Sequence, residues 1–251
     1  MTGDDKKGIS RLKKLLAYEF EIKDLGKLQY FLGIEAARSK RGIFISQRKY
    51  ILDLLKETGM TGCRPAESPI ESNHKLQSGV GESIDKERCQ RLVGRLIYLS
   101  HNRPNIAYSV SLVSQFMHDP RDPHMQAAFH ILCYMKSAPG KGQLFSKHDH
   151  LQTEAFTDAD WAGSLDDRRS TFGYCTLAGG NLVTWRSKKQ SIVARSSAEA
   201  EYRAMAQGVC ELLWLQKLLH ELRLYEKEKL SLYCDNKVAI SIDHNLVQHD
   251  R

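Results

Sequence analysis

The chain has 251 residues, of which 41% are hydrophobic and 27% are charged, so it can form one large folded domain or two smaller ones and is not intrinsically disordered. No apolar run approaches the roughly 18 residues that mark a membrane span, and the polar residues 1–10 lack the apolar segment of a signal peptide. The six cysteines are scattered without a C-x-x-C pair, which favours free thiols in an intracellular, reducing compartment.

The net charge of +7 is unevenly distributed along the chain. Residues 1–150 carry 24 basic and 16 acidic residues, a net charge of +8, whereas residues 151–251 carry 13 and 14, a net charge of −1. A basic surface next to an acidic, metal-binding site would suit a protein that binds a polyanion such as nucleic acid at one place and cleaves it at another. A solvated basic surface without a partner is the plainer alternative, and charge alone is equally compatible with it.

The first 150 residues show one amphipathic helix, two strands and then a mainly helical pattern. The predicted elements are a helix over 10–20, strands over 28–35 and 42–46, a helix over 46–58, and three helices that begin at Asp85, Pro104 and Pro123. Ser46 is expected to cap the second helix and Gly59 to end it. Proline, serine and glycine residues over 63–81 predict a linker or a long loop.

The last hundred residues change to a strand-rich pattern interrupted by one long helix. The predicted elements are strands over 151–158, 169–178, 182–186 and 191–195, a helix over 198–222, a strand over 229–234, and the start of a helix over 238–242. The Gly179-Gly180-Asn181 sequence predicts a tight turn between two of these strands.

Three acidic residues stand where such elements can bring them together. Asp158 and Asp235 end apolar, strand-like runs, and Glu201 lies in the first turns of the long helix. Either aspartate alone is more often a turn residue than a ligand. Strand ends and a neighbouring helix can nevertheless converge on one point, and clustered carboxylates suit Mg²⁺ or Mn²⁺. Two such ions about 4 Å apart can clamp a phosphodiester, which predicts a metal-dependent nuclease.

Glu199 competes with Glu201 for the middle position, because the two side chains point to different sides of the helix. Glu201 lies on the same helix face as Met205 and Gly208, and it should be the first residue of the face that packs against the sheet. Glu199 stands at the helix entrance, where an acid complements the helix dipole. We therefore predict Glu201 as the ligand.

Basic residues at two places are the predicted contacts to phosphate groups. Arg38, Lys40 and Arg41 lie in the turn between the first two strands; Arg186, Lys188 and Lys189 lie in and after a later strand. Basic residues at exposed turns are ordinary features of protein surfaces, so these positions are weaker predictions than the carboxylates.

Several long sequence runs, taken together, resemble one family. The runs are 24–34 (DLGKLQYFLGI), 91–99 (RLVGRLIYL), 103–108 (RPNIAY), 158–163 (DADWAG) and 196–204 (SSAEAEYRA). In this order they resemble the C-terminal part of the Pol polyprotein of copia-type LTR retrotransposons, and the resemblance covers nearly the whole chain. It implies the end of a reverse transcriptase palm and thumb over 1–80, a helical connection region over 81–150, and an incomplete RNase H-like domain over 151–251.

The resemblance also implies a fold class and an activity. The fold would be α/β and α+β, ending in an RNase H-like mixed five-stranded sheet with flanking helices. Asp158, Glu201 and Asp235 match the carboxylates that hold two Mg²⁺ or Mn²⁺ ions and cut the RNA strand of an RNA–DNA hybrid. The expected partners are an RNA–DNA hybrid or other nucleic acid and the rest of the Pol polyprotein, without a membrane.

Two parts of the family pattern do not match, which leaves alternatives open. The chain starts downstream of the Tyr-x-Asp-Asp hairpin that binds the polymerase metals, so no polymerase activity is expected. It also stops before the fourth acidic position of the family's RNase H, so weak cleavage or none is expected. A nucleic-acid-binding relic without catalysis is therefore the alternative, and a host-recruited interaction protein would leave no positive trace in the sequence.

Overall fold

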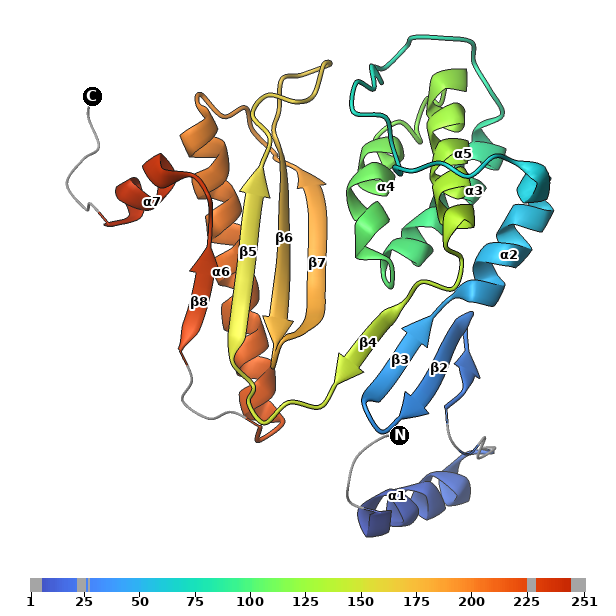
Figure 1. Ribbon diagram of the computed structural model, residues 1–251, viewed down its shortest axis with the longest axis vertical. Helices are drawn as coiled ribbons and strands as arrows, with labels where there is room; N and C mark the ends of the chain where they lie inside the picture. Colours follow the sequence, from blue (N-terminus) through green and yellow to red (C-terminus); the bar gives the residue numbers. More distant parts are fainter. Residues whose placement is uncertain (1–5, 22–25, 27, 225–228, 245–251) are drawn as a thin grey trace.

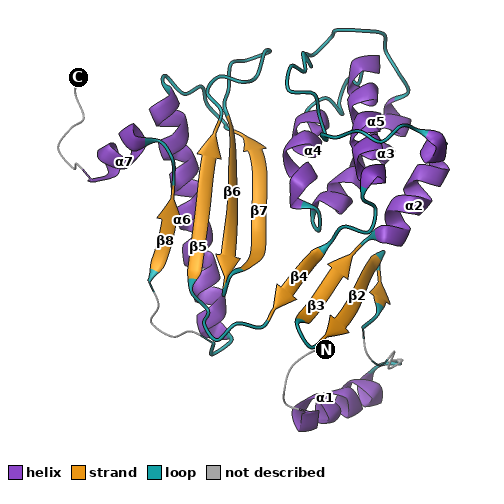
Figure 2. Ribbon diagram, viewed as in Figure 1, coloured by secondary structure: helices purple, strands orange, loops and turns teal. Residues whose placement is uncertain are grey.

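The computed structural model describes residues 6–21, 26, 28–224 and 229–244 (Figures 1 and 2). The first residues of the 24–34 run lie outside this description. The described chain is a mixed α/β protein with seven α-helices and two four-stranded sheets. Figure 1 shows one sheet beneath a group of helices and the other beside a single long helix.

The first sheet is antiparallel and has the order β1-β2-β3-β4. Its strands are β1 (Tyr30–Phe31), β2 (Ile34–Ser39), β3 (Gly42–Ser46) and β4 (Gln143–Ser146). The predicted strand over 28–35 is split, because Leu32 and Gly33 form a turn with φ values of 49° and 81°. The sequence patterns missed β4, which brings residues 143–146 from the predicted helical region back to pair with β3.

The helices of the first part are α1 (Lys6–Glu19), α2 (Arg48–Glu57), α3 (Lys86–Ser100), α4 (Ala107–Ser114) and α5 (Asp122–Ser137), with 3-10 turns at Met60–Gly62 and Pro104–Ile106. Asp85 caps α3 by accepting hydrogen bonds from two backbone amides. Gly59 follows α2 with φ 71°, as predicted. Ser46 does not cap α2, because its hydroxyl donates to Glu35 instead.

One hydrophobic core holds helices α2 to α5 together. Its fully buried side chains come from all four helices and from the turn that precedes α4: Ile51, Val93, Leu96, Leu99, Ile106, Val110, Val113, Ile131, Leu132 and Met135. Residues on both sides of position 80 share this core. The long loop over 63–81 runs along the outside of α5, where Ala66 donates to the Cys133 carbonyl at 3.2 Å.

The second sheet has the order β7-β6-β5-β8. Its strands are β5 (Thr153–Ala159), β6 (Thr171–Ala178), β7 (Asn181–Lys189) and β8 (Leu230–Tyr233). β8 runs parallel to β5 and the other pairs are antiparallel. Gly179 and Gly180 form the predicted turn with φ values of 53° and 71°.

One sequence expectation for this sheet is wrong, and another is met only in part. β7 is one continuous strand to Lys189, and residues 191–195 form bends rather than a second strand. The described part of the sheet has four strands, not the five that the family resemblance implied.

Helix α6 (Ser197–Glu221) packs along one face of the second sheet, and α7 (Lys237–His244) follows β8 (Figure 1). The approach is close at Gly208, where an added Cβ would lie 2.5 Å from Thr157 and 2.9 Å from Leu232. A side chain at this position would therefore push α6 away from β5 and β8. This contact holds the first turns of α6 against the carboxyl ends of these strands.

Hydrogen bonds between side chains and backbone join the two parts of the protein. Trp185 of β7 donates from its indole nitrogen to the Ser100 carbonyl at 2.9 Å. Asn181 exchanges two hydrogen bonds with the backbone of Ser146, at 2.7 and 2.9 Å. The group of helices α2 to α5 thus lies against the face of the second sheet that α6 does not cover.

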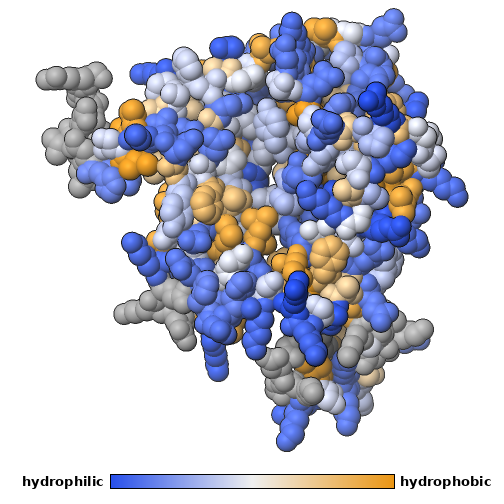
Figure 3. All heavy atoms as spheres, in the orientation of Figure 1, coloured by the Kyte–Doolittle hydropathy of each residue, from blue (hydrophilic) through white to orange (hydrophobic). Residues whose placement is uncertain are grey.

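In the view of Figure 3, hydrophilic residues dominate the surface and apolar side chains form small, separate groups. No helix in the described parts of the chain is long and apolar enough to cross a membrane.

The close contact at Gly208 generates a stability prediction. Gly208→Ala should lower the free energy of unfolding by about 1–3 kcal/mol, because the new methyl group overpacks the α6–sheet contact. Gly94→Ala is the matched control, since Gly94 also lies within a helix but has nothing within 4 Å of an added Cβ. The control should raise stability by roughly 0.5–1 kcal/mol through helix propensity. Urea unfolding of both variants measures this, and equal effects would contradict the packing argument.

Candidate metal centre

The two aspartates lie at the same edge of the second sheet. Asp158 is the penultimate residue of β5, and Asp235 follows the end of β8 by two residues. β5 and β8 are parallel neighbours in which Phe156 pairs with Tyr233, so each aspartate comes two residues after a paired position. The parallel pairing therefore brings both residues to the carboxyl edge of the sheet, and both side chains are exposed.

Glu201 reaches this edge from the second turn of α6. Its side chain is buried, at 5% exposure, and its Oε1 accepts a hydrogen bond from the backbone amide of Ala159 at 3.1 Å. Ser196 caps the helix by accepting from the amide of Glu199. The capped first turn and the bond to Ala159 together hold the Glu201 carboxylate between β5 and β8.

Glu199 has a different role at the helix entrance. Its carboxylate accepts from the amide of Arg195 at 2.8 Å and pairs with the guanidinium of Arg203 at 2.8 Å. The Arg195 amide and the Arg203 side chain hold the pKa of Glu199 below its usual value. The structure thus places Glu201, and not Glu199, against the strand that carries Asp158.

A thiol that the sequence patterns missed joins this group. The ligand atoms of Glu201, Cys234 and Asp235 all lie within 4.8 Å of one another. The Cys234 thiol donates to Oε2 of Glu201 at 3.8 Å. In the sequence, the only indication that Cys234 belongs to this group is its position directly before Asp235. Asp158 is not part of this close group among the residues that the structure describes.

Asp158 faces a cavity on the opposite side of the sheet from α6. Along β5, Ala155 and Thr157 are buried, whereas Phe156 and Asp158 are exposed. The cavity has a volume of about 560 Å³. The residues that line it come from β5 and the turn after it, from β6 and β7, and from α4 and the 3-10 turn before it, among them Tyr108, Phe156, Asp158, Asp160, Trp185 and Arg186. The side chains of Asp158 and Glu201 therefore lie on opposite faces of the sheet, and their charges interact across the end of β5.

Electrostatic repulsion links the three carboxylates despite this geometry. Burial raises the pKa of Glu201, the amide of Ala159 opposes this, and the charges of Asp158 and Asp235 raise the pKa further. Because like charges at one edge disfavour ionisation, a bound cation would relieve the repulsion. Carboxylate oxygens are the ligands that Mg²⁺ and Mn²⁺ prefer, so the donor set fits these ions.

Two other polar residues near the site have structural roles. Asp160 accepts from the backbone amide of Thr171 and holds the turn after β5. Burial raises its pKa, the Thr171 amide opposes this, and the charge of Asp158 raises it further. Asn236 accepts from the amides of Val238 and Ala239 at the start of α7.

The predicted phosphate contacts fall at two distant places. Arg38, Lys40 and Arg41 are exposed at the turn between β2 and β3, at the end of the molecule away from the arrowhead of β5 (Figure 1). Arg186, Lys188 and Lys189 lie at the end of β7, the same edge of the sheet as the carboxylates. The turn between β2 and β3 is therefore not part of the carboxylate site.

The residues at the end of β7 differ in their availability for phosphate. Lys189 pairs with Asp167 at 3.0 Å, and Arg186 hydrogen-bonds to Tyr174. Lys188 is exposed. It pairs with Phe172 of β6, and Phe172 in turn pairs with Ala159 of β5. Two strand spacings, about 10 Å, therefore separate the backbone of Lys188 from the carboxyl end of β5.

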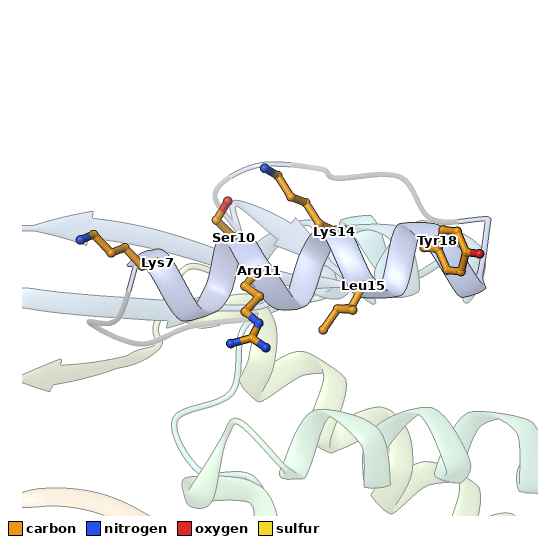
Figure 4. A pocket seen from close by; sticks show the side chains of 6 residues that line it. All are labelled: Lys7, Ser10, Arg11, Lys14, Leu15 and Tyr18. Atoms are coloured by element: carbon orange, nitrogen blue, oxygen red, sulfur yellow. The ribbon is translucent and has the colours of Figure 1, made fainter.

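Helix α1 adds a basic surface that none of the sequence patterns indicated. Lys7, Arg11 and Lys14 are exposed along it, and Figure 4 shows Lys7 and Lys14 extending from a different side of the helix than Arg11. Leu15 and Tyr18 are exposed on the same helix, so this surface is both basic and apolar.

Comparisons with known proteins match the chain to a reverse transcriptase model and to several Pol polyproteins. Residues 1–72 match a family model described as reverse transcriptase (RNA-dependent DNA polymerase). The whole chain is 41% identical to a retrovirus-related Pol polyprotein from transposon RE1 of Arabidopsis thaliana and 35% identical to one from transposon TNT 1-94 of Nicotiana tabacum. It covers 17% and 20% of these relatives, so it spans about a fifth or less of their length.

A shorter relative is similar in extent to this chain. An uncharacterized mitochondrial protein of Arabidopsis thaliana is 37% identical over 85% of the chain, and the match covers 89% of that protein. No solved structure matches the chain. On the strength of these relatives, the chain belongs to the family of copia-type, retrovirus-related Pol polyproteins.

Proposed function

We propose that residues 151–251 form an RNase H-like domain that cleaves the RNA strand of RNA–DNA hybrids with two divalent metal ions. The observation that carries the proposal is the meeting of Glu201 with Asp235 at the edge where Asp158 ends β5. Two exposed aspartates next to a buried, anchored glutamate suit a site that binds ions from one side and substrate from the other. Within this proposal, residues 1–80 and 81–150 correspond to the end of the reverse transcriptase and to the connection region.

Each carboxylate has a distinct part in the proposed site. Glu201 is held by the amide of Ala159, so its position does not depend on the ions. Asp235 lies close to Glu201, and Asp158 approaches from the other face of the sheet. Two Mg²⁺ or Mn²⁺ ions at such a site would stabilise the attacking and leaving oxygens of the phosphodiester.

The basic residues are the proposed contacts to the phosphates of nucleic acid. Lys188 lies at the same sheet edge as the carboxylates, where it can contact the phosphates that flank the cleaved bond. The turn between β2 and β3 and helix α1 carry further exposed basic residues at a distance. Such contacts bind nucleic acid through phosphates and without reading its sequence.

The rest of the polyprotein is the proposed protein partner. Near the start of the described chain, large apolar side chains are exposed on α1 and around β1: Leu15, Tyr18, Phe20, Tyr30, Phe31 and Leu32. Exposed apolar groups of this size are typical of interaction surfaces. Preceding parts of a reverse transcriptase would cover them.

One observation favours a second candidate, a binding protein without catalysis. Asp158 lies outside the close group that Glu201 forms with Cys234 and Asp235. If the three carboxylates never share ions, the basic surface of residues 1–150 would remain as the functional feature. The cleavage experiment below separates the two candidates.

The first prediction concerns the three carboxylates. Asp158→Asn, Glu201→Gln and Asp235→Asn should each abolish the weak cleavage of a labelled RNA–DNA hybrid that is expected of this chain, because removing one preorganised electrostatic group costs about 100-fold or more. Glu199→Gln is the matched control, because it changes the same chemical group two residues away and should leave cleavage close to the parent rate. Assays in Mg²⁺ and in Mn²⁺ measure this. Absence of cleavage above the Asp158→Asn background in both ions would favour the binding protein.

The second prediction follows from the raised pKa of Glu201. The folded chain favours the protonated form, so this residue's contribution to stability falls as pH rises from below the usual glutamate pKa through the raised value. Glu201→Gln should therefore raise the melting temperature at neutral pH without metal, and this gain should shrink in acid. Mn²⁺ should stabilise the parent chain more than the variant in thermal unfolding. A variant that is less stable than the parent at neutral pH would contradict the repulsion argument.

The third prediction concerns the phosphate grip at the sheet edge. Lys188→Ala should weaken hybrid binding and reduce the slope of log affinity against log salt by about 0.9, the value for one lost phosphate contact. Lys217→Ala is the control, because Lys217 is an exposed lysine on α6 that faces Glu221 instead. Fluorescence anisotropy at several salt concentrations compares them, and equal slopes for both variants would remove Lys188 from the interface.

A further inference from the structure

We infer that Glu201, Cys234 and Asp235 form a binding site for a thiophilic divalent cation such as Zn²⁺ or Cd²⁺, and that this cation displaces Mg²⁺ or Mn²⁺ from the carboxylates. The displacement rests on the proposed function, because it concerns the same carboxylates. The site itself uses a ligand set that includes a thiol and leaves out Asp158.

The geometry of the three side chains already approaches that of a tetrahedral site. In a zinc site with Zn–S near 2.3 Å and Zn–O near 2.1 Å, neighbouring sulfur and oxygen ligands lie about 3.6 Å apart. The Cys234 sulfur lies 3.8 Å from Oε2 of Glu201, and the Asp235 carboxylate is within 4.8 Å of both. Small side-chain rotations would complete three ligand positions, and water would supply the fourth.

The location of Glu201 makes this more than a surface cluster. Its side chain is 5% exposed and its other oxygen is held by the Ala159 amide, so Oε2 is presented in a fixed direction. Cys234 and Asp235 are adjacent in the chain directly after β8, which limits their movement relative to α6. A ligand set that is already in place loses little conformational entropy when an ion binds.

The chemistry of the thiol distinguishes the two kinds of cation. Thiolate sulfur is a soft ligand that selects zinc-like ions, whereas carboxylate oxygens suit Mg²⁺ and Mn²⁺. Without a soft cation, the protonated thiol donates to Glu201 and leaves the oxygen site available. When a soft cation binds, the sulfur–metal bond replaces the sulfur–hydrogen bond and the proton passes to the buffer. Glu201 and Asp235 are then engaged and no longer free for Mg²⁺.

The test is a Cd²⁺ titration of the full chain, followed by the ultraviolet charge-transfer band of a cadmium–thiolate bond. All forms carry Cys63→Ser, because Cys63 and Cys133 hydrogen-bond to each other and could bind Cd²⁺ separately. The parent in this background should show one saturable band. Cys234→Ser should abolish the band, and Cys210→Ser, at an exposed cysteine on α6, should not change it.

Two further variants test the ligand set without removing the thiol. Glu201→Gln should weaken Cd²⁺ binding by at least about tenfold, because loss of a partner behind a metal ligand already costs about 10–100-fold. Asp158→Asn should leave the band in place and weaken Cd²⁺ binding less than Glu201→Gln does, since Asp158 acts only through its charge and is not in the set. A band that survives Cys234→Ser, or one that Asp158→Asn removes, would overturn the assignment.

Displacement has its own readout, which does not require cleavage. Mn²⁺ bound to the protein is measured from the loss of its free-ion paramagnetic resonance signal, and Zn²⁺ is then added. Zn²⁺ should release Mn²⁺ from the parent at concentrations at least about tenfold lower than from Cys234→Ser. Equal release from both would overturn displacement through the thiol. A chain that shows the cadmium band but cleaves no hybrid would overturn the proposed function and leave this site standing.

Discussion

The contact between α6 and the parallel pair β5–β8 is the constraint on which the candidate site depends. Gly208 lets the helix lie directly on Thr157 and Leu232, so the first turns of α6 reach the carboxyl ends of both strands. The Ala159 amide then binds Glu201. Since Asp158 and Asp235 end these same strands, one packing contact sets the relative positions of all three acids.

The site concentrates negative charge at a cost in stability. Glu201 is buried beside a second carboxylate and within electrostatic reach of a third, and the pKa of Glu201 rises as a result. A fold selected for stability alone would place a neutral or apolar side chain there, because uncompensated buried charge is unfavourable. Clustered carboxylates of this kind, with one of them buried, fit the proposed cation site.

The helical part affects the site through the uncovered face of the second sheet. α4 and β7 meet there, Trp185 donates to the Ser100 carbonyl, and Ser78 donates to Asp166 at 2.7 Å. The cavity that Asp158 faces is lined from both parts of the protein. The surroundings of one of the three acids are thus determined by residues from the first half of the chain.

Local patterns in the sequence were sufficient for most helices, for the turn at Gly179–Gly180 and for the choice of Glu201 as the residue facing the sheet. These features depend on helical periodicity, capping and backbone conformation, which act over a few residues and can be read directly. The strand ends and the first turns of the long helix singled out the three acids, and the family resemblance matched the same residues. Their role as metal ligands stays a prediction.

Only the tertiary structure decided the features that depend on distant partners. Residues 143–146 form strand β4 because they pair with the edge of β3. Ser46 does not cap α2 because its hydroxyl donates to Glu35 on the neighbouring strand. Asp158 faces a cavity made by α4, and Cys234 meets Glu201 because α6 packs over β8. By itself, the sequence determined which residues could carry the chemistry. The packing of elements far apart in the chain decided which of them meet, because no local pattern records a contact between distant segments.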